Sequence, residues 1–299
     1  MKTKNKIAII GAGVVGTALG YLLKKSGYPL AGIASRTMAS AKKAGGFIGE
    51  RSVSTDLAAI ARKADIVFIT TSDRSIEAAC KKIAAGKGFR KGVVVFHTCG
   101  ALSSSVLLSA KKNGACIASF HPLQSCPSVQ EAIKRIQGSY FFIEGDEAAL
   151  LVARKIIIAL KGKEITLTIN TKTLYHAGAC AASNFLVATV GLGLELFEAA
   201  GINRVDALRA LMPLIKGTVK NIEKLGVPSA LTGPIARGDS DIIDEHLKAM
   251  AREREDLTAL YSELGRYTVR LGIGKGTLKE KEAKKILALF NTYQKGKKR

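Results

Sequence analysis

A glycine-rich turn near the start of the chain constrains its fold more than any other feature. The apolar, β-branched run Ile7–Ile10 leads into Gly11-Ala-Gly-Val-Val-Gly16, and an apolar helical pattern follows at once. This G-x-G-x-x-G spacing between a strand and a helix is typical of dinucleotide-binding turns. The first glycine permits a tight turn, the second leaves room for a pyrophosphate, and the third lets the helix pack closely on the strand. We expect the helix N-terminus to bind phosphate through Gly11, Ala12, Gly13, Val14, Val15 and Gly16.

The end of the second predicted strand, residues 29–35, indicates which dinucleotide binds. An NAD-binding chain of this kind carries a carboxylate here for the ribose 2′-hydroxyl, but this chain reads Ser35-Arg36-Thr37. A guanidinium between two hydroxyls suits a 2′-phosphate, because charged bidentate hydrogen bonds and neutral donors can hold it. We therefore expect NADP as the cofactor. The alternative is that Arg36 is an ordinary exposed residue before a helix that Thr37 caps.

The pattern of apolar residues changes near residue 165. Residues 1–164 alternate short apolar strands with helical patterns, which is typical of a doubly wound parallel sheet. Residues 165–299 show almost only helical patterns. We expect an α/β protein with a Rossmann-like domain over 1–164 and an all-α domain over 165–299, each of ordinary domain size.

Polar residues occupy the carboxyl ends of several apolar strands in the first domain. Ligands of open α/β sheets lie beyond these ends. We expect His97 to line the cofactor site and His121 to lie near the substrate, although either histidine can instead be structural and bonded to the backbone. The run 103–105, three serines, is expected to cap a helix. The remaining predicted cofactor contacts follow the strand that begins near Ala64, and they are Thr70, Thr71, Ser72 and Asp73.

A polar stripe marks the long helix predicted over residues 171–200. Lys172, His176, Cys180 and Asn184 recur at every fourth residue and share one face. A lysine or histidine there could protonate a substrate carbonyl, and the asparagine could orient a substrate amide or carboxylate. The alternative is that Lys172 and His176 are ordinary residues of the first turn, and that Cys180 and Asn184 are packing residues without a chemical role.

The loop 231–239, Leu-Thr-Gly-Pro-Ile-Ala-Arg-Gly-Asp, combines a rigid turn with one cation. Arg237 could clamp a substrate carboxylate or a cofactor phosphate, with Thr232 beside it. The alternative is an interhelical turn in which Arg237 pairs with Asp239.

These motifs together resemble one bacterial family over nearly the full chain. The resemblance is carried by the glycine turn, by 97–100 (His-Thr-x-Gly), 119–125 (Ser-x-His-Pro-Leu-Gln-Ser), 172–178 (Lys-x-x-Tyr-His-Ala-Gly), 182–184 (Ala-Ser-Asn) and the loop 231–239. The family joins a Rossmann-like domain to a helical domain of unknown function, of the phosphogluconate-dehydrogenase-like kind. It is more distantly similar to ketopantoate, pyrroline-5-carboxylate and β-hydroxyacid reductases. The resemblance implies an NADP-dependent reductase that forms a homodimer through its helical domain.

One departure from these relatives concerns the catalytic helix. In the ketopantoate and β-hydroxyacid branches, a lysine and an asparagine on the first helix after the Rossmann domain carry the catalysis. This chain has Lys172, but the position one turn later is His176 and the asparagine is Asn184. The mechanism and the substrate of those relatives therefore do not transfer directly.

Composition excludes several other classes of protein. A hydrophobic content of 47% is too high for a disordered chain. The net charge of +22 would suit nucleic acid, but the basic residues are spread over many predicted helices and no nucleic-acid-binding motif occurs, so we expect a solvated basic surface. The five cysteines lack metal or disulfide spacing, so we expect no metal site. No signal peptide precedes the first strand and apolar stretches are interrupted early, so we expect a cytoplasmic protein without membrane contact.

These features predict an NADP-dependent oxidoreductase. A hydride would pass to a small anionic keto or imino compound, ketopantoate-like, in the cleft between the domains. Lys172 or His176 would stabilise or protonate the developing alkoxide, and the substrate would be oriented by His121, Asn184, Thr232 and Arg237. The alternative is a sensor or scaffold that binds NADP without turnover.

Overall fold

The chain forms two compact units in the computed structural model, which describes residues 5–295. The first unit ends at Ser183 and the second begins at Asn184, so the division lies within helix α8 (Lys172–Ala199). The sequence instead indicated a domain boundary after residue 164. The first turns of α8 belong to the first unit because the Lys172 side chain is buried there, at 1% exposure.

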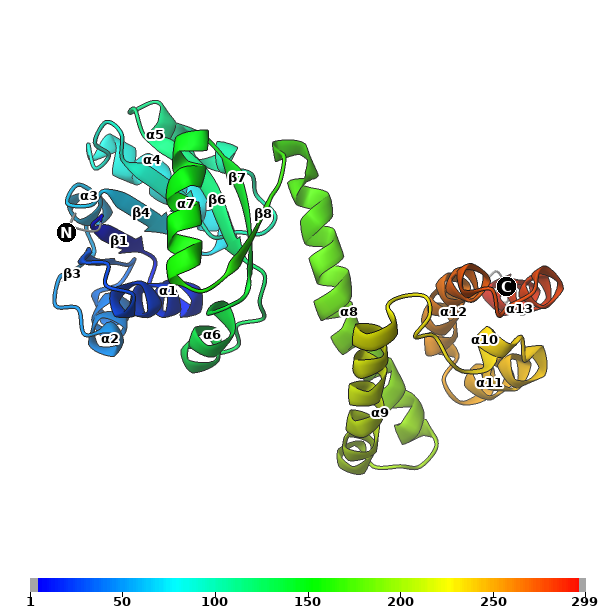
Figure 1. Cartoon of the computed structure of the whole chain (residues 1–299). Coiled ribbons are helices and arrows are strands. Elements are labelled where there is room, and N and C mark those ends of the chain that lie inside the picture. Colours follow the sequence, from blue (N-terminus) through cyan, green and yellow to red (C-terminus); the bar gives the residue numbers. More distant parts are fainter. Residues whose placement is uncertain (1–4, 296–299) are drawn as a thin grey trace. The chain divides into compact units, whose positions relative to one another are not determined.

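One mostly parallel sheet organises the first unit (Figure 1). Its strand order is β3-β2-β1-β4-β5-β6-β7-β8, and all neighbouring pairs are parallel except β6 with β7. This confirms the predicted α/β class with a Rossmann-like sheet. The strands are β1 (Ile7–Ile10), β2 (Leu30–Ala34), β3 (Val53–Ser54), β4 (Ile66–Ile69), β5 (Val94–His97), β6 (Cys116–Pro122), β7 (Tyr140–Gly145) and β8 (Lys163–Thr166).

The reversed strand β7 departs from the fully parallel sheet that the sequence suggested. Helix α6 (Val129–Ile136) connects β6 to β7, and its eight residues span only about 12 Å. The connection brings the chain back beside the end of β6, where the Leu123 N–H donates to the Tyr140 carbonyl oxygen. Strand β7 therefore begins where β6 ends, with Pro122 opposite Phe141.

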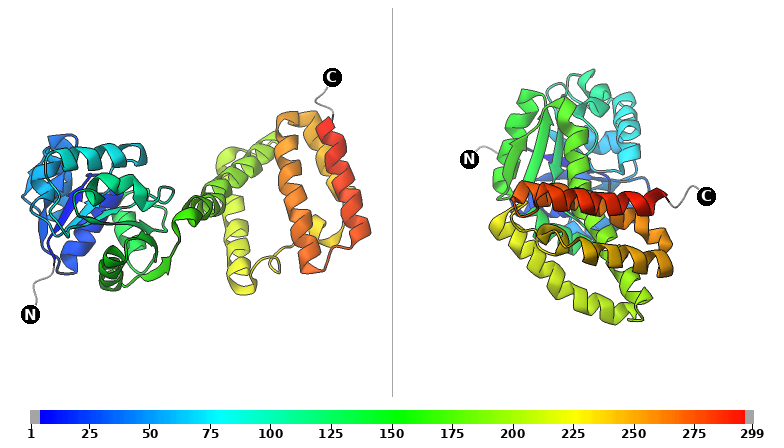
Figure 2. Two further views of the ribbon diagram at one scale, coloured as in Figure 1. Left: turned by 90° about the horizontal axis from the view of Figure 1, so that it is seen from above. Right: turned by 90° about the vertical axis from the view of Figure 1, so that its right-hand side faces the viewer.

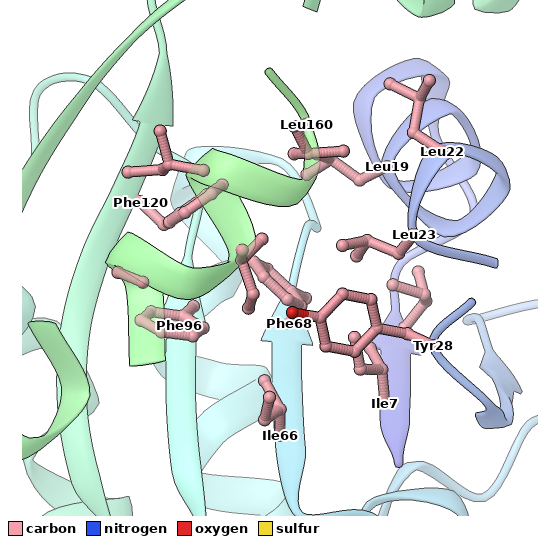
Figure 3. Packing of buried hydrophobic residues seen from close by; sticks show 14 of the residues in the cluster. Ile7, Leu19, Leu22, Leu23, Tyr28, Ile66, Phe68, Phe96, Phe120 and Leu160 are labelled. Atoms are coloured by element: carbon pink, nitrogen blue, oxygen red, sulfur yellow. The ribbon is translucent and has the colours of Figure 1, made fainter. Parts of the chain in front are cut away.

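Helices cover both faces of the sheet, which explains why its inner strands are apolar throughout. On one face, Phe68, Phe96 and Phe120 of adjacent strands pack against one another and against α1 and α7 (Figure 3). Each such buried ring contributes about 2–3 kcal/mol of transfer free energy. The opposite face packs against α3, α4 and α5. The remaining helical elements of this unit are α1 (Val14–Lys25), α2 (Met38–Ile48), α3 (Leu57–Ala61), η1 (Asp73–Ser75), α4 (Ile76–Ala85), η2 (Ser104–Leu107), α5 (Leu108–Lys111), α7 (Glu147–Ala159) and η3 (Ile169–Thr171).

The second unit is helical, as predicted. Helices α12 and α13 lie side by side (Figure 2). Gly265 of α12 lets the Phe290 ring of α13 approach, since a Cβ there would lie 2.3 Å from the ring. Ile243 and Leu247 complete a small core with these helices. The loop predicted over 231–239 contains one short helix, α10. The helices after α8 are α9 (Arg204–Leu225), α10 (Pro234–Arg237), α11 (Ser240–Glu253), α12 (Glu255–Lys275) and α13 (Glu280–Lys295).

Many apolar side chains of α8 and α9 are exposed. Among the described residues, the segment Ile169–Ala199 is the one stretch long and apolar enough to cross a membrane by length and composition, although the sequence analysis expected none. Helix α9 buries only Ala207 among its described side chains. Leucine, valine and phenylalanine side chains are at least 60% exposed at Leu174, Phe185, Val187, Val205 and Leu214.

Candidate active site

The glycine turn has the geometry that a dinucleotide requires. Gly11 has a φ of 118°, and a Cβ there would lie 2.6 Å from the Thr70 carbonyl carbon. At Gly16 a Cβ would lie 2.2 Å from the Gly11 oxygen, so both positions need glycine for packing. At Gly13, by contrast, a Cβ would have no atom within 4 Å. Gly13 therefore borders open space at the start of α1, where backbone N–H groups can receive a phosphate.

Thr70 braces this turn from the end of β4. Its hydroxyl donates a hydrogen bond of 2.8 Å to the Gly11 carbonyl oxygen, and its side chain is buried. Thr71 is adjacent, and its hydroxyl is buried without a hydrogen-bond partner. A buried unpaired hydroxyl is costly, so it is a candidate contact for a bound polar group.

A cavity of about 550 Å³ extends from the glycine turn. Arg36 lines it at the end of β2, and the Thr37 hydroxyl, which caps α2, donates to the Ser40 hydroxyl over 2.8 Å. Thr37 therefore caps α2, as the alternative interpretation of the sequence predicts, and it also lines the cavity. The predicted residues in this lining are Gly11, Ala12, Gly13, Ser35, Arg36, Thr37, Thr70, Thr71 and Ser72. Further lining residues that the sequence analysis missed include Ser40, Thr55 and Lys82.

Other predicted cofactor residues lie outside this lining. Val14 and Val15 are half-buried and pack against the core. Asp73 begins η1. Burial raises the pKa of the Cys99 thiol, and the Asp73 carboxylate raises it further by a smaller amount.

His97 is fully buried, at 0% exposure. Its Nε2 lies 3.2 Å from the Ser103 carbonyl oxygen, and its Nδ1 accepts from the Cys99 N–H over 3.2 Å. Both ring nitrogens are thus bonded to the backbone, which is the structural role weighed as the alternative in the sequence analysis. Burial lowers the pKa of His97 to about 3, and electrostatic repulsion from Lys172 and from His121 adds to this effect. The hydrogen bond with Ser103 opposes the shift only in part. The His97 ring is therefore neutral near pH 7.

Lys172, at the start of α8, brings an unpartnered amine into the same unit. Its Nζ is buried and has no hydrogen-bond partner. The Nζ lies 6.0 Å from the centre of the Tyr175 ring. Burial lowers the pKa of Lys172 to about 8, against opposing contributions from Glu144 and Cys99. A pKa near the working pH is what a general acid needs.

His121 and His176 lie beside Gly100, and Tyr175 contacts His121. The Tyr175 hydroxyl and His121 Nδ1 share a hydrogen bond of 2.7 Å, and the Tyr175 ring stacks on Phe142 with centroids 4.1 Å apart. A Cβ at Gly100 would lie 2.5 Å from His176 Cδ2 and 2.9 Å from His121 Cε1. The structure therefore brings the predicted residues Lys172, His121 and His176 into one cluster. Tyr175 was missed, although its place three residues after Lys172 puts it on a neighbouring helix face.

The charge states in this cluster distinguish the candidate proton donors. Burial, Lys172 and His176 together lower the pKa of His121 to about 4, so its ring is neutral near pH 7. Burial raises the pKa of Tyr175, so its phenol keeps its proton. Of Lys172, His97 and His121, only Lys172 therefore carries a transferable proton near pH 7.

The other predicted site residues lie in the second unit. Asn184 is exposed on α8. Thr232 and Arg237 line a cavity of about 470 Å³ with Lys275, whose Nζ donates to the Leu231 carbonyl oxygen over 2.7 Å. Arg237 pairs with Asp239 at 2.8 Å, as the alternative reading expected. Among the described residues, no group of three metal-ligating side chains could hold an ion.

Two parts of the chain match known protein families. Residues 1–122 match the Rossmann-like domain, and residues 139–268 match a domain of unknown function, DUF2520. This confirms the predicted combination of domains. No curated protein matches the chain.

Solved structures are similar over nearly the whole chain. A protein from Bacteroides fragilis, assigned as an NADP oxidoreductase, is 24% identical with a TM-score of 0.73, covering 90% of this chain and 99% of its own. A protein from Thermotoga maritima is 26% identical with a TM-score of 0.69 and the same coverage. The reductive aminase from Aspergillus terreus in complex with NADPH and ethyl levulinate is 16% identical, with a TM-score of 0.63 over 97% of this chain and 99% of its own. These likenesses support the phosphogluconate-dehydrogenase-like fold.

Proposed function

We propose that this chain, a Rossmann-like domain joined to a DUF2520 domain, is an NADP-dependent reductase of small anionic keto or imino compounds. The observation that carries the proposal is the buried, unpartnered amine of Lys172, which shares a compact unit with an intact dinucleotide turn. The known structures of similar fold support it, because they include an NADPH-bound reductive aminase.

The glycine turn and the end of β2 would hold the cofactor. The N–H groups at the start of α1 would bind the pyrophosphate beside Gly13, and Arg36 with its neighbouring hydroxyls would bind the 2′-phosphate. When bound, NADPH supplies a hydride to a carbonyl or imine carbon.

The clustered side chains would supply the proton and orient the substrate. Lys172 would donate a proton to the developing alkoxide or amine, since it is charged near pH 7 while His97 and His121 are neutral. The neutral His121, fixed by Tyr175, would hydrogen-bond the substrate. His176 is the second candidate donor, because it meets His121 across Gly100.

A substrate that carries a carboxylate would need a positively charged side chain of the protein to bind that carboxylate. We propose that Arg237 and Thr232, which line one cavity of the second unit, bind a carboxylate, and that Asn184 is a further substrate-binding residue of this unit, as the sequence motifs suggested. The net charge of +22 would attract such anions. A 2-keto acid of the ketopantoate kind and a keto acid offered with an amine are the first substrates to test.

We also propose that the protein is a homodimer held through its helical unit. The support is the pair of exposed apolar side chains Leu214 and Leu225, which share one face of α9 and which a second protein surface would bury.

The test is NADPH oxidation over a panel of keto acids, with and without amines. Lys172→Ala and His176→Ala are each expected to lose at least tenfold in turnover while NADPH affinity is kept. Lys155→Ala, which removes an exposed lysine of α7, is the matched control and should keep full activity. Unchanged turnover in both Lys172→Ala and His176→Ala would refute the assignment. NADPH binding without oxidation across the panel would instead favour a sensor.

A further inference from the structure

Two oppositely charged side chains are buried in the first unit. Lys172 is 1% exposed and Glu144 is 3% exposed, and they are the only buried lysine, arginine, aspartate or glutamate side chains among the described residues. One lies at the start of α8 and the other near the end of β7. An isolated buried charge is very costly, so two opposite ones in one unit point to mutual stabilisation.

Glu144 is held in a fixed position from a distant part of the chain. Its carboxylate accepts from the Ser104 N–H over 2.9 Å and from the Ser104 hydroxyl over 2.6 Å. Both donors are neutral, so neither cancels the negative charge. This also explains the serine run at 103–105, because Ser104 binds Glu144 instead of capping a helix.

Glu144 belongs to a row of three polar side chains on the neighbouring strands β7, β6 and β5. Glu144 lies opposite Ser119 of β6, and Ser119 lies opposite His97 of β5. Facing residues of neighbouring strands point to the same face, so these three side chains share it. The Ser119 hydroxyl is buried without a partner, and His97 is neutral. Glu144 is therefore the only carboxylate in this row.

The surroundings of Lys172 leave Glu144 as its main counter-charge. The titratable groups that act on or face Lys172 are His97, Cys99, His121, Tyr175 and Glu144. Both histidines are neutral near pH 7, and burial raises the pKa values of the thiol and the phenol so that they stay uncharged. Of the two groups that raise the pKa of Lys172 against burial, Glu144 contributes more than Cys99.

We propose that Glu144 is a positioning residue for the reaction, the buried counter-charge that keeps the Lys172 ammonium protonated. This rests on the proposed role of Lys172 as proton donor. Behind Glu144 lies a cavity of about 370 Å³, which is lined also by Ser104, Lys111 and Asp146. This cavity would admit a small carboxylate if the Glu144 side chain were removed.

The first experiment titrates Lys172 itself and needs no substrate. In the full-length protein with ¹³C-labelled lysine Cε, the Lys172 resonance is assigned by its loss in Lys172→Arg, and its shift is followed against pH. The wild-type midpoint is expected near pH 8. Glu144→Gln should lower it by about one pH unit or more, because the counter-charge is gone. Glu164→Gln, which removes an exposed carboxylate bonded to Arg154, is the control and should leave it unchanged.

A conservative variant guards against misfolding. Glu144→Asp keeps the charge and should keep the Lys172 midpoint close to the wild-type value, with thermal melting reporting the fold of every variant. An unchanged midpoint in Glu144→Gln would overturn the proposal. A midpoint lowered as far in Glu144→Asp as in Glu144→Gln would also overturn it, because structural disturbance would then explain both.

The second experiment uses turnover. Glu144→Gln should lower kcat about tenfold with little change in KM for NADPH, and its rate should begin to fall at a lower pH than in the wild type. Formate should restore part of the activity of Glu144→Ala but none of the activity of Lys172→Ala. Absence of rescue together with an unshifted pH profile would count against Glu144. If no substrate is turned over, the proposed function fails while the titration of Lys172 still decides the role of Glu144.

Discussion

Replacing Gly13 by alanine separates cofactor binding from folding. A Cβ at this position meets no atom within 4 Å, and the backbone angles of −78° and −174° are open to alanine. The residue caps α1, where alanine is a weaker cap than glycine, so we expect a cost of at most about 1 kcal/mol in the free energy of unfolding. The new methyl group points into the space where the pyrophosphate would contact the backbone.

The expected loss of NADPH affinity follows from that lost contact. A hydrogen bond to a charged group contributes about 1.5–3 kcal/mol. Losing one weakens binding between about tenfold and about a hundredfold.

The assay is a titration of NADPH fluorescence, with urea unfolding of each variant as the stability measurement. Gly46→Ala is the matched control, because its Cβ also meets no atom within 4 Å but lies on α2, outside the lining of the cofactor cavity. Gly16→Ala should instead destabilise the fold by about 1–3 kcal/mol, because its Cβ would lie 2.2 Å from the Gly11 oxygen. If Gly13→Ala binds NADPH as tightly as the wild type, the dinucleotide does not bind at this turn.

Three further predictions follow from the same structure. Arg36→Ala should weaken NADPH binding at least tenfold and leave NADH binding nearly unchanged, as fluorescence titration with both cofactors would reveal, since only NADPH carries the 2′-phosphate. Lowering the pH from 7 to 5 should destabilise the protein by about 2 kcal/mol for each of His97 and His121, because their pKa values are lowered in the folded state and only the unfolded state takes up the protons in this range. Urea unfolding at both pH values checks this, and a loss as large in His97→Gln as in the wild type would contradict it for that residue. Leu214→Glu should turn a dimer into a monomer in analytical ultracentrifugation while Lys216→Glu should not, and an unchanged sedimentation coefficient in Leu214→Glu would argue against α9 as the interface.

The sequence predicted those parts of the site that are formed by residues close together in the chain. The glycine turn, the apolar strands and the hydroxyl-flanked Arg36 are each read from a few neighbouring residues, and the structure brings them around one cavity. The four-residue spacing placed Lys172 and His176 on one helix face, but it did not reveal that Lys172 is buried and His176 only half-buried.

Contacts between residues that are far apart in the chain could not be predicted from local spacing. Glu144 ends an apolar strand and looks like an exposed residue in sequence, yet Ser104, forty positions earlier, holds it inside the protein. Tyr175 becomes a site residue only because β6 and β7 are antiparallel, which places Phe142 beside His121 as a platform for its ring. The apolar pattern did not specify the direction of β7, which the structure shows to be antiparallel to β6.

The central claim is that Lys172 donates the proton in an NADPH-dependent reduction. The most direct measurement is the pH dependence of NADPH oxidation by the wild type and by Lys172→Arg, with a substrate from the keto acid panel. The account predicts a wild-type rate that falls above about pH 8, where Lys172 loses its proton, and a rate at least tenfold lower in Lys172→Arg at every pH, because a guanidinium keeps its proton and cannot donate it. A wild-type rate that stays constant from pH 7 to pH 10, or a rate in Lys172→Arg equal to that of the wild type, would contradict it.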